Sequence, residues 1–559
     1  MDSPAASQMG IIQDHCDAEH VAADGTTRGR PNGTRSEWRA LLMKPLRAAI
    51  VLTSVVCLCL PAWSAGAEPG DRPNCLLILA DDLGYGDLAC YGHRRVQTPH
   101  IDRLAAEGLR LTSCYSAAAN CSPARAGLMT GRTPSRVGIY NWIPGLCPMH
   151  VRRSEITVAS LLRNAGYDTC QSGKWHLNGD LIPFGTPATR ALHPIAGLAG
   201  APAVNAIKWP SQPQPWDHGF GHWFATQNNA LPNHRDPVNF VRNGKPVGPL
   251  QGYAADLVAN EAISWMESRR DATRPFFLFL CFHEPHEPIA SARKYTDLYP
   301  SDDPSFAAHH GNITQMDAAC GRVLKALDRL KLREDTLVVF TSDNGPAITG
   351  IHPHGSAGPL RDKKGSIYEG GIRVPGILRW PGHIQPGTTS DVAVSGVDIL
   401  PTMCALAGID EPRDRVLDGV SLLPLLRGQP LVRHHPLYWQ FHRARSRVKV
   451  AIRDGDWKLC AALTSPTPKP SGGIAEGEMA ALKSAELTGF ELYDLKQDVG
   501  ERRDVAQARP QVLAALRAKM IRLHHEVRAE GPLWPAWEWP RYESQRIEWP
   551  EYWKRRKKR

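Results

Sequence analysis

Two pairs of oxygen-bearing side chains follow apolar runs that are typical of buried strands. Asp81 and Asp82 come directly after one such run, and Asp343 and Asn344 come after another. Ligands bind at the carboxyl ends of the strands in open α/β sheets, and hard carboxylate and amide oxygens favour calcium or magnesium over zinc. The two pairs therefore predict one divalent-cation site, with an exposed acidic loop as the alternative for Asp81 and Asp82.

A cysteine at the start of an expected helix is the second chemical feature. Residues 121–132 read Cys-Ser-Pro-Ala-Arg-Ala-Gly-Leu-Met-Thr-Gly-Arg. Helix amino termini favour anions through their dipole and free amide groups, and Arg125 falls on the same helical face as Cys121. These residues alone leave open a buried structural thiol, half of a disulfide, or a reactive group beside an anion site.

Basic side chains that could hold an anion come later in the chain. Lys174 and His176 are separated by one residue, so they point the same way if this segment is extended. His286 follows the apolar run 275–282, and a histidine after a core strand is more often a structural hydrogen-bonding group than a catalyst. Because its ordinary pKa is near 6.5, such a histidine could also donate a proton near neutral pH.

In their order along the chain, these stretches resemble the type I sulfatases, arylsulfatase-like members of the alkaline-phosphatase superfamily. In that family a maturation enzyme oxidises the cysteine of Cys-X-Pro-X-Arg to formylglycine (3-oxoalanine). The resemblance covers about Arg72 to Arg528. The stretches that carry it are 81–87, 121–132, 172–177, 283–288, 342–345 and 360–375. It implies a sulfuric ester hydrolase that depends on calcium, or on magnesium.

The resemblance also assigns roles to residues of this chain. The implied metal ligands are Asp81, Asp82, Asp343 and Asn344, and the implied catalytic residues are Cys121, Arg125, Lys174, His176, His286 and Lys364. Arg125 would hold the aldehyde hydrate and the metal-site carboxylates, while Lys174 and Lys364 would bind sulfate. His176 would steady the hydrate, and His286 would contact sulfate and protonate the leaving oxygen, with His283 as a neighbouring candidate.

Oxidation of the cysteine explains the chemistry that the resemblance implies. A thiol with a pKa of about 8.5 is only partly ionised at neutral pH, and a thiolate that attacked sulfur would leave a stable adduct. One hydroxyl of an aldehyde hydrate would instead attack the sulfur of a sulfate ester, and the second would collapse to aldehyde and expel sulfate. Two alternatives stay open: a phosphate or phosphonate ester hydrolase of the same superfamily, and a non-catalytic binder of sulfated glycans.

Strand and helix patterns predict an α/β catalytic domain over residues 68–429, with a large, mostly parallel mixed sheet between helices. The expected strands are 75–80, 109–115, 275–282 and 336–341, and the expected helices include 99–107, 124–130, 156–166 and 253–269. Shorter strands at 437–441, 448–453 and 457–461 and a last helix at 510–528 follow. They predict a small antiparallel subdomain with a helix over residues 430–530.

Residues 181–251 are rich in Pro, Gly, Trp and His and show no clear periodicity. Long irregular segments often line or cover a site, so we expect substrate specificity to lie here. Trp216, His218, His222 and Trp223 are candidates for stacking on a sugar or bonding to it. A sulfated carbohydrate is therefore favoured over a simple aryl ester as the substrate.

The formal net charge of +10 owes much to the run Lys554–Arg559, in a Trp-rich tail over 531–559. Such a run is usually a solvated, disordered end, and attraction to an anionic polymer such as a sulfated polysaccharide is the alternative. No zinc-finger, RNA-recognition or helix-turn-helix signature indicates a nucleic-acid partner.

The amino end predicts export. A basic segment at 43–47, an apolar run at 48–60 and small residues up to Ala67 have the pattern of a secretory signal peptide, preceded by a non-native extension over 1–42. The run is too short to span a bilayer comfortably, so the mature protein is expected in the periplasm or outside the cell without a membrane span, with an uncleaved anchor as the alternative. Nine cysteines remain after cleavage and modification of Cys121, so they cannot all pair.

Overall fold

The computed structural model describes residues 72–182, 211–468, 472–537 and 546–558. The expected extension and signal peptide, residues 1–67, lie outside this part of the chain and stay predictions. Among the described residues, no helix is both long and apolar enough to cross a membrane.

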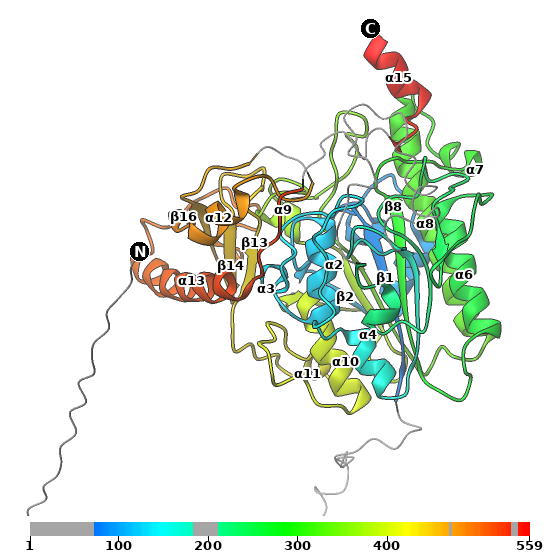
Figure 1. The fold of residues 1–559 in the computed structure, drawn as a ribbon, viewed down its shortest axis with the longest axis horizontal. Coiled ribbons are helices and arrows are strands. Elements are labelled where there is room, and N and C mark those ends of the chain that lie inside the picture. Colours follow the sequence, from blue (N-terminus) through cyan, green and yellow to red (C-terminus); the bar gives the residue numbers. More distant parts are fainter. Residues whose placement is uncertain (1–71, 183–210, 469–471, 538–545, 559) are drawn as a thin grey trace, which may run out of the picture. The chain divides into compact units, whose positions relative to one another are not determined.

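A ten-stranded mixed sheet carries the fold (Figure 1). In spatial order its strands are β11 (Thr388–Ser390), β2 (Leu109–Leu111), β10 (Gly376–Arg379), β9 (Thr336–Ser342), β1 (Asn74–Asp81), β8 (Phe276–Pro285), β4 (Asp168–Lys174), β5 (His222–Thr226), β6 (Val241–Arg242) and β7 (Lys245–Pro246). The central strands β9, β1, β8, β4 and β5 run parallel, and β10 and β6 pair antiparallel at their flanks. The predicted large, mostly parallel sheet is confirmed.

Strand β1 shows why the sheet is covered on both faces. All eight of its residues are buried, and because successive side chains of a strand point to opposite faces, they feed two separate cores. Leu76 and Ile78 pack in one core with α1 (Pro99–Ala106), α6 (Ala254–Ser268) and α8 (Pro304–Arg329). Leu77 and Leu79 pack in the other with α2 (Cys121–Thr130), α4 (Val158–Asn164) and α10 (Ile399–Ala407). Because both faces of β1 are covered, its sequence is a continuous apolar run and does not alternate with polar residues.

A four-stranded antiparallel sheet follows the large one in the chain. Its strands are β13 (Leu437–Gln440), β14 (Val450–Asp454), β15 (Trp457–Leu463) and β16 (Leu487–Asp494). Helix α13 (Pro510–Glu530) packs on β14 and β15. The predicted small antiparallel sheet with its helix is confirmed, while the domain boundaries placed at 68, 430 and 530 stay predictions.

Two predicted elements differ from the structure. Residues 109–115 do not form one strand, because β3 (Cys114–Tyr115) leaves the large sheet and pairs with β12 (Val394–Ser395). The described part of 181–251 is not wholly irregular, because it contains the 3₁₀ helix η3 (Pro215–His218) and strands β5 to β7. These strands are short, so they leave little periodicity in the sequence.

A further helix lies in the basic tail. Helix α15 (Glu551–Lys558) includes most of the Lys and Arg run, so α13 is not the last helix of the described residues. The described cysteines, ten from Cys75 to Cys460, are all free thiols.

A buried ion cluster holds the small sheet to the segment that begins helix α9 (Glu369–Ile372). Lys458 on β15 is fully buried, and its Nζ lies 3.0 Å from Glu369 Oε1 and 2.9 Å from Glu501 Oε1. Burial opposes ionisation of Glu369, but the charge of Lys458 lowers the pKa of this carboxyl to about 2. The lysine thus balances charges from two separate segments.

Replacing Lys458 with Met should destabilise the fold, because it removes the cation that Glu369 and Glu501 share and leaves Glu369 paired with Arg373 alone among the described residues. We expect the free energy of unfolding to fall by about 3–5 kcal/mol, measured by urea denaturation at neutral pH. Lys519→Met is the matched control, since its partner Asp454 and the lysine itself are both substantially exposed and the pair should contribute about 1 kcal/mol or less. Equal losses in the two variants would contradict this account.

Candidate active site

Adjacent strands β1 and β9 bring the two predicted ligand pairs together. Ala80 pairs with Ser342 in the sheet, so Asp81–Asp82 and Asp343–Asn344 leave the same edge side by side. The Asp82 amide donates to Asp343 Oδ1 at 3.2 Å, and Asn344 Nδ2 donates to Asp82 Oδ1 at 2.7 Å. The left-handed backbone of Asp82, with φ of 67°, makes the tight turn after the strand. All four predicted ligands therefore meet at one place.

Three cations from separate elements balance these carboxylates. Arg125 on α2 donates from Nε and Nη2 to Asp343 Oδ2 at 3.0 and 2.8 Å, and Nη2 lies 3.7 Å from Asp81 Oδ2. Lys174, at the carboxyl end of β4, reaches Asp81 Oδ2 at 2.5 Å. Lys364 Nζ lies 2.6 Å from Asp82 Oδ1 and 2.8 Å from its Oδ2.

Two unused oxygens show that the cluster fits a cation. Asp81 Oδ1 and Asn344 Oδ1 are buried and have no hydrogen-bond partner in the structure. Leaving a buried acceptor unsatisfied is costly, and a hard cation would use both atoms. Ligand atoms of Asp81, Asp82 and His286 also lie within 4.8 Å of one another. The donor set is thus mainly oxygen, as the sequence predicts, with one imidazole close to it.

Electrostatics distinguish the two carboxylates that face Arg125. Burial favours the neutral form of Asp81, but the charges of Lys174, His286 and Arg125 lower its pKa well below the usual range. Burial and the negative charge of Asp81 raise the pKa of Asp343 to about 7. Asp81 is therefore ionised at neutral pH. A negative charge on Asp343 is unfavourable, and a nearby cation would stabilise it.

Cys121 is the first residue of α2, as the sequence predicts, although the helix begins three residues earlier than the expected 124–130. Asn120 precedes it, and its Oδ1 accepts hydrogen bonds from the Cys121 amide at 2.9 Å and from Sγ at 3.4 Å. Burial raises the pKa of the Cys121 thiol, although the charges of Lys174 and Lys364 act in the opposite direction. An unmodified Cys121 would therefore be a weak nucleophile.

The two site histidines have defined hydrogen-bonding roles. His176 Nε2 lies 3.1 Å from the carbonyl oxygen of Ile143, so Nε2 carries a proton and the buried Nδ1, which has no partner, is left as an acceptor. Burial lowers the pKa of His176 well below its usual value. His286 donates from Nδ1 to the carbonyl of Glu287, and its Nε2 lies 3.6 Å from Asp82 Oδ2.

The condition of an extended backbone from Lys174 to His176 is not met. Strand β4 ends at Lys174, and His176 adopts a left-handed conformation with φ of 58°. This turn, rather than strand alternation, determines where the imidazole lies. Lys363, the neighbour of Lys364, is directed away and donates to the carbonyl of Ile348 at 2.6 Å.

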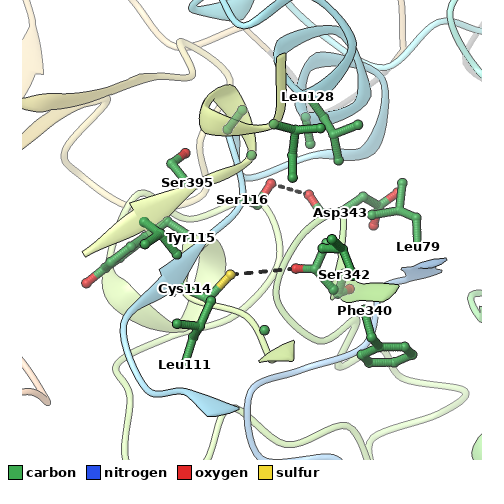
Figure 2. Close-up of a pocket in the computed structure, with 18 of the residues that line it drawn as sticks. Leu79, Leu111, Cys114, Tyr115, Ser116, Leu128, Phe340, Ser342, Asp343 and Ser395 are labelled. Carbon is green, nitrogen blue, oxygen red and sulfur yellow. Dashed lines mark hydrogen bonds between the residues drawn. The ribbon is translucent and has the colours of Figure 1, made fainter. Parts of the chain in front are cut away.

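A small cavity lies behind the site, between α2 and the sheet (Figure 2). Its volume is about 30 Å³, and Leu79, Leu111, Leu128 and Phe340 give it an apolar lining. Asp343 borders it through its backbone, whose carbonyl accepts a hydrogen bond from Ser116 Oγ. The cavity has room for a water molecule but not for a substrate.

The predicted sugar-binding residues are not suited to that role. His218 and Trp223 are buried in the structure, and the His218 ring lies 5.9 Å from that of Trp175. His222 is at the amino end of β5, four residues from the site edge, and pairs with Glu261 at 2.8 Å. Trp216 is half-exposed but lies under the guanidinium of Arg163 on α4. Composition alone was therefore a poor guide to the substrate face.

Sequence reasoning also missed residues around the site. Asn120 could have been recognised, because asparagine is a preferred residue immediately before a helix. No pattern in the sequence distinguishes His234. In the structure both of its ring nitrogens are buried without a partner, and its ring lies 5.6 Å from that of His283. His283 itself bonds to Thr226 Oγ1 at 2.7 Å through Nε2.

The chain matches two known family models. The family model described as Sulfatase matches residues 73–409, and the one described as N-sulphoglucosamine sulphohydrolase, C-terminal, matches residues 360–466. The chain belongs to the sulfatase family. It is therefore a sulfuric ester hydrolase, and the sulfatase resemblance of its motifs is confirmed.

Several sulfatases are similar to this one over most of its length. Arylsulfatase A of Homo sapiens is 36% identical over 479 residues, which cover 82% of this chain and 88% of that protein. The N-acetylgalactosamine-6-O-sulfatase of Bacteroides thetaiotaomicron is 30% identical over 500 residues, covering 80% and 92%. The crystal structure of Ps i-CgsB in complex with k-i-k-neocarrahexaose has a TM-score of 0.66 and 26% identity, covering 82% and 94%. The alkaline-phosphatase-like fold expected of a sulfatase is thus confirmed.

Proposed function

We propose that this sulfatase hydrolyses sulfate esters of carbohydrates, using formylglycine made from Cys121 by a maturation enzyme, beside a bound calcium ion. The observation that carries the proposal is the convergence of three features: Cys121 at the amino end of α2, a carboxylate cluster with two unused buried oxygens, and lysines that reach the same carboxylates. Each feature comes from a different part of the chain.

The residues around Cys121 fit an oxidised side chain. Formylglycine would supply a hydrated aldehyde as the nucleophile. The free Nδ1 of His176 can accept a hydrogen bond from a hydroxyl there, because its Nε2 proton already binds the Ile143 carbonyl. Arg125 fixes Asp343 and the Lys174 carbonyl from the same helix. The nucleophile and the carboxylates are thus positioned together.

Calcium would be held by Asp81, Asp82, Asp343 and Asn344, and its charge would stabilise sulfate oxygens; magnesium is the alternative ion. Lys174 and Lys364 now neutralise Asp81 and Asp82, and a bound cation would free both ammonium groups to bind sulfate. Fixed charges of this kind contribute about 3–4 kcal/mol each to transition-state stabilisation in other enzymes.

His286 is suited to protonate the departing oxygen. Its Nδ1 proton is hydrogen-bonded to the Glu287 carbonyl. The proton that is transferred would therefore be the one on Nε2, which faces the carboxylate cluster. A positioned acid of this type typically accelerates a reaction about 10²–10⁴-fold. The benefit is greatest for a poor leaving group, such as a sugar hydroxyl.

Some relatives are named for carbohydrate substrates, while others, such as the steryl-sulfatase of Mus musculus, are not. One curated relative is named for its action on the 6-O-sulfate of N-acetylgalactosamine, and one similar structure contains a carrageenan-type hexaose. A carbohydrate-directed enzyme with the predicted signal peptide would act in the periplasm or outside the cell.

Cys121→Ala should abolish hydrolysis of 4-nitrophenyl sulfate and leave the fold intact, since it removes the nucleophile and only one buried atom. Cys90→Ala is the matched control, because that thiol lies outside the site and should leave turnover unchanged. Mass spectrometry of the peptide that contains Cys121 should detect the aldehyde in wild-type protein produced with the maturation enzyme. Near-normal turnover in Cys121→Ala would contradict the mechanism.

Removing calcium should lower both activity and stability. A cation that binds only the folded state at about 100 times its dissociation constant adds about 2.7 kcal/mol to the free energy of unfolding. We expect chelation to lower the melting temperature, calcium to restore it, and Asp81→Ala to show no response to either treatment. A chelator response that persists in Asp81→Ala would place the ion elsewhere.

Matched sulfate and phosphate esters distinguish sulfatase action from the phosphatase alternative. We expect kcat/KM for 4-nitrophenyl sulfate to exceed that for 4-nitrophenyl phosphate, measured with the same preparation. The reverse order would favour a phosphate or phosphonate ester hydrolase.

A further inference from the structure

Glu287 connects the candidate active site to the last helix of the chain. Its backbone carbonyl accepts the Nδ1 proton of His286, and its side chain lies outside the carboxylate cluster. Glu287 Oε1 is 3.0 Å from His352 Nδ1 and also accepts a hydrogen bond from Thr349 Oγ1. His352 Nε2 in turn lies 2.6 Å from the hydroxyl of Tyr552 on α15. Hydrogen bonds on the side chain and on the backbone of Glu287 thus link α15 to His286 through this one residue.

The chemistry of each group indicates the direction of these bonds for a neutral His352 ring. Glu287 Oε1 accepts a hydrogen bond from Thr349 Oγ1, and as an acceptor it pairs with a protonated Nδ1 of His352. In the neutral ring Nε2 is then an acceptor, and the Tyr552 hydroxyl is the group that can donate to it. Removing that hydroxyl would leave Nε2 of His352 without this donor.

The link is built into the fold around it. The His352 side chain is only 1% exposed, and a buried polar ring that loses a partner is costly. The His352 amide donates to Thr349 Oγ1 at 3.0 Å, so one loop holds Glu287 from two sides. The segment before α15 is fixed independently, because the Glu548 amide donates to the Pro232 carbonyl at 2.8 Å.

We propose that Tyr552 is a positioning residue for catalysis: through His352 and Glu287, the C-terminal helix fixes the orientation of His286. The inference rests on the proposed function, in which His286 protonates the leaving oxygen. The proposal gives the Trp-rich, basic tail a role in catalysis that is separate from attraction of an anionic polymer. The side chain of Glu287 anchors the peptide whose carbonyl holds the imidazole, so loosening the anchor lets the proton-donating Nε2 drift from the ester oxygen.

The leaving group supplies the test. Phenyl sulfate releases a more basic oxygen than 4-nitrophenyl sulfate, so it depends more on a proton donor. We expect Tyr552→Phe to lower kcat on phenyl sulfate about tenfold, and kcat on 4-nitrophenyl sulfate by less than about twofold. His352→Gln should give the same selectivity. His286→Ala should give a larger one, and adding Tyr552→Phe to it should have no further effect.

Tyr299→Phe is the matched control, because it removes a hydroxyl that bonds to Gln97 and Thr314 away from the site. Rates are compared at equal formylglycine content, measured by mass spectrometry, and the control should show the wild-type ratio for the two esters. An unchanged ratio in Tyr552→Phe, or an equal loss on both esters, would overturn the inference while the proposed function stands. Failure of the fully oxidised wild type on both esters would overturn the proposed function, and this inference with it.

Discussion

Repulsion among buried carboxylates is the constraint on which the site depends. Asp81 and Asp82 offer ligand atoms within 4.8 Å of each other, and Asp343 is held beside Asp81 by Arg125. At about 4 Å and an effective dielectric constant near 20, two like charges repel by about 4 kcal/mol. Such a cluster persists only where cations balance it. Here the balance comes from Arg125, Lys174 and Lys364, which belong to three different segments of the chain.

The fold meets this requirement by bringing strand ends and one helix to a single edge. Parallel strands β1, β4 and β9 deliver Asp81, Lys174 and Asp343 to that edge, and α2 delivers Cys121 and Arg125. Strands that are buried on both faces are rigid supports, so the polar groups at their ends need little further ordering. The same cations that hold the cluster together are those a sulfate group would need. Binding of a divalent ion would therefore transfer the lysines from a structural role to a substrate-binding one.

Much of this site could be predicted from sequence, for local reasons. Asp81 and Asn344 follow long apolar strands, and Cys121 begins a helix, so their positions depend on patterns of a few residues. The link from Tyr552 to Glu287 could not be predicted, because Tyr552 and His352 are 200 residues apart. A hydrogen bond between distant side chains leaves no periodic pattern in the sequence. Short strands such as β6 were missed for a similar reason. Trp223 and His218 were wrongly expected to contact a sugar, because residue type alone does not distinguish a buried aromatic side chain from one on a sugar-binding face.

The cation is the part of the account that a single measurement can test most directly. A crystal grown with calcium should show one ion about 2.3–2.6 Å from oxygens of Asp81, Asp82, Asp343 and Asn344, with Lys174 and Lys364 released from their carboxylates. Density at residue 121 in the same crystal should show whether the side chain beside the ion is oxidised. Lysines still paired with Asp81 and Asp82 at saturating calcium, and no ion between the strands, would contradict the account.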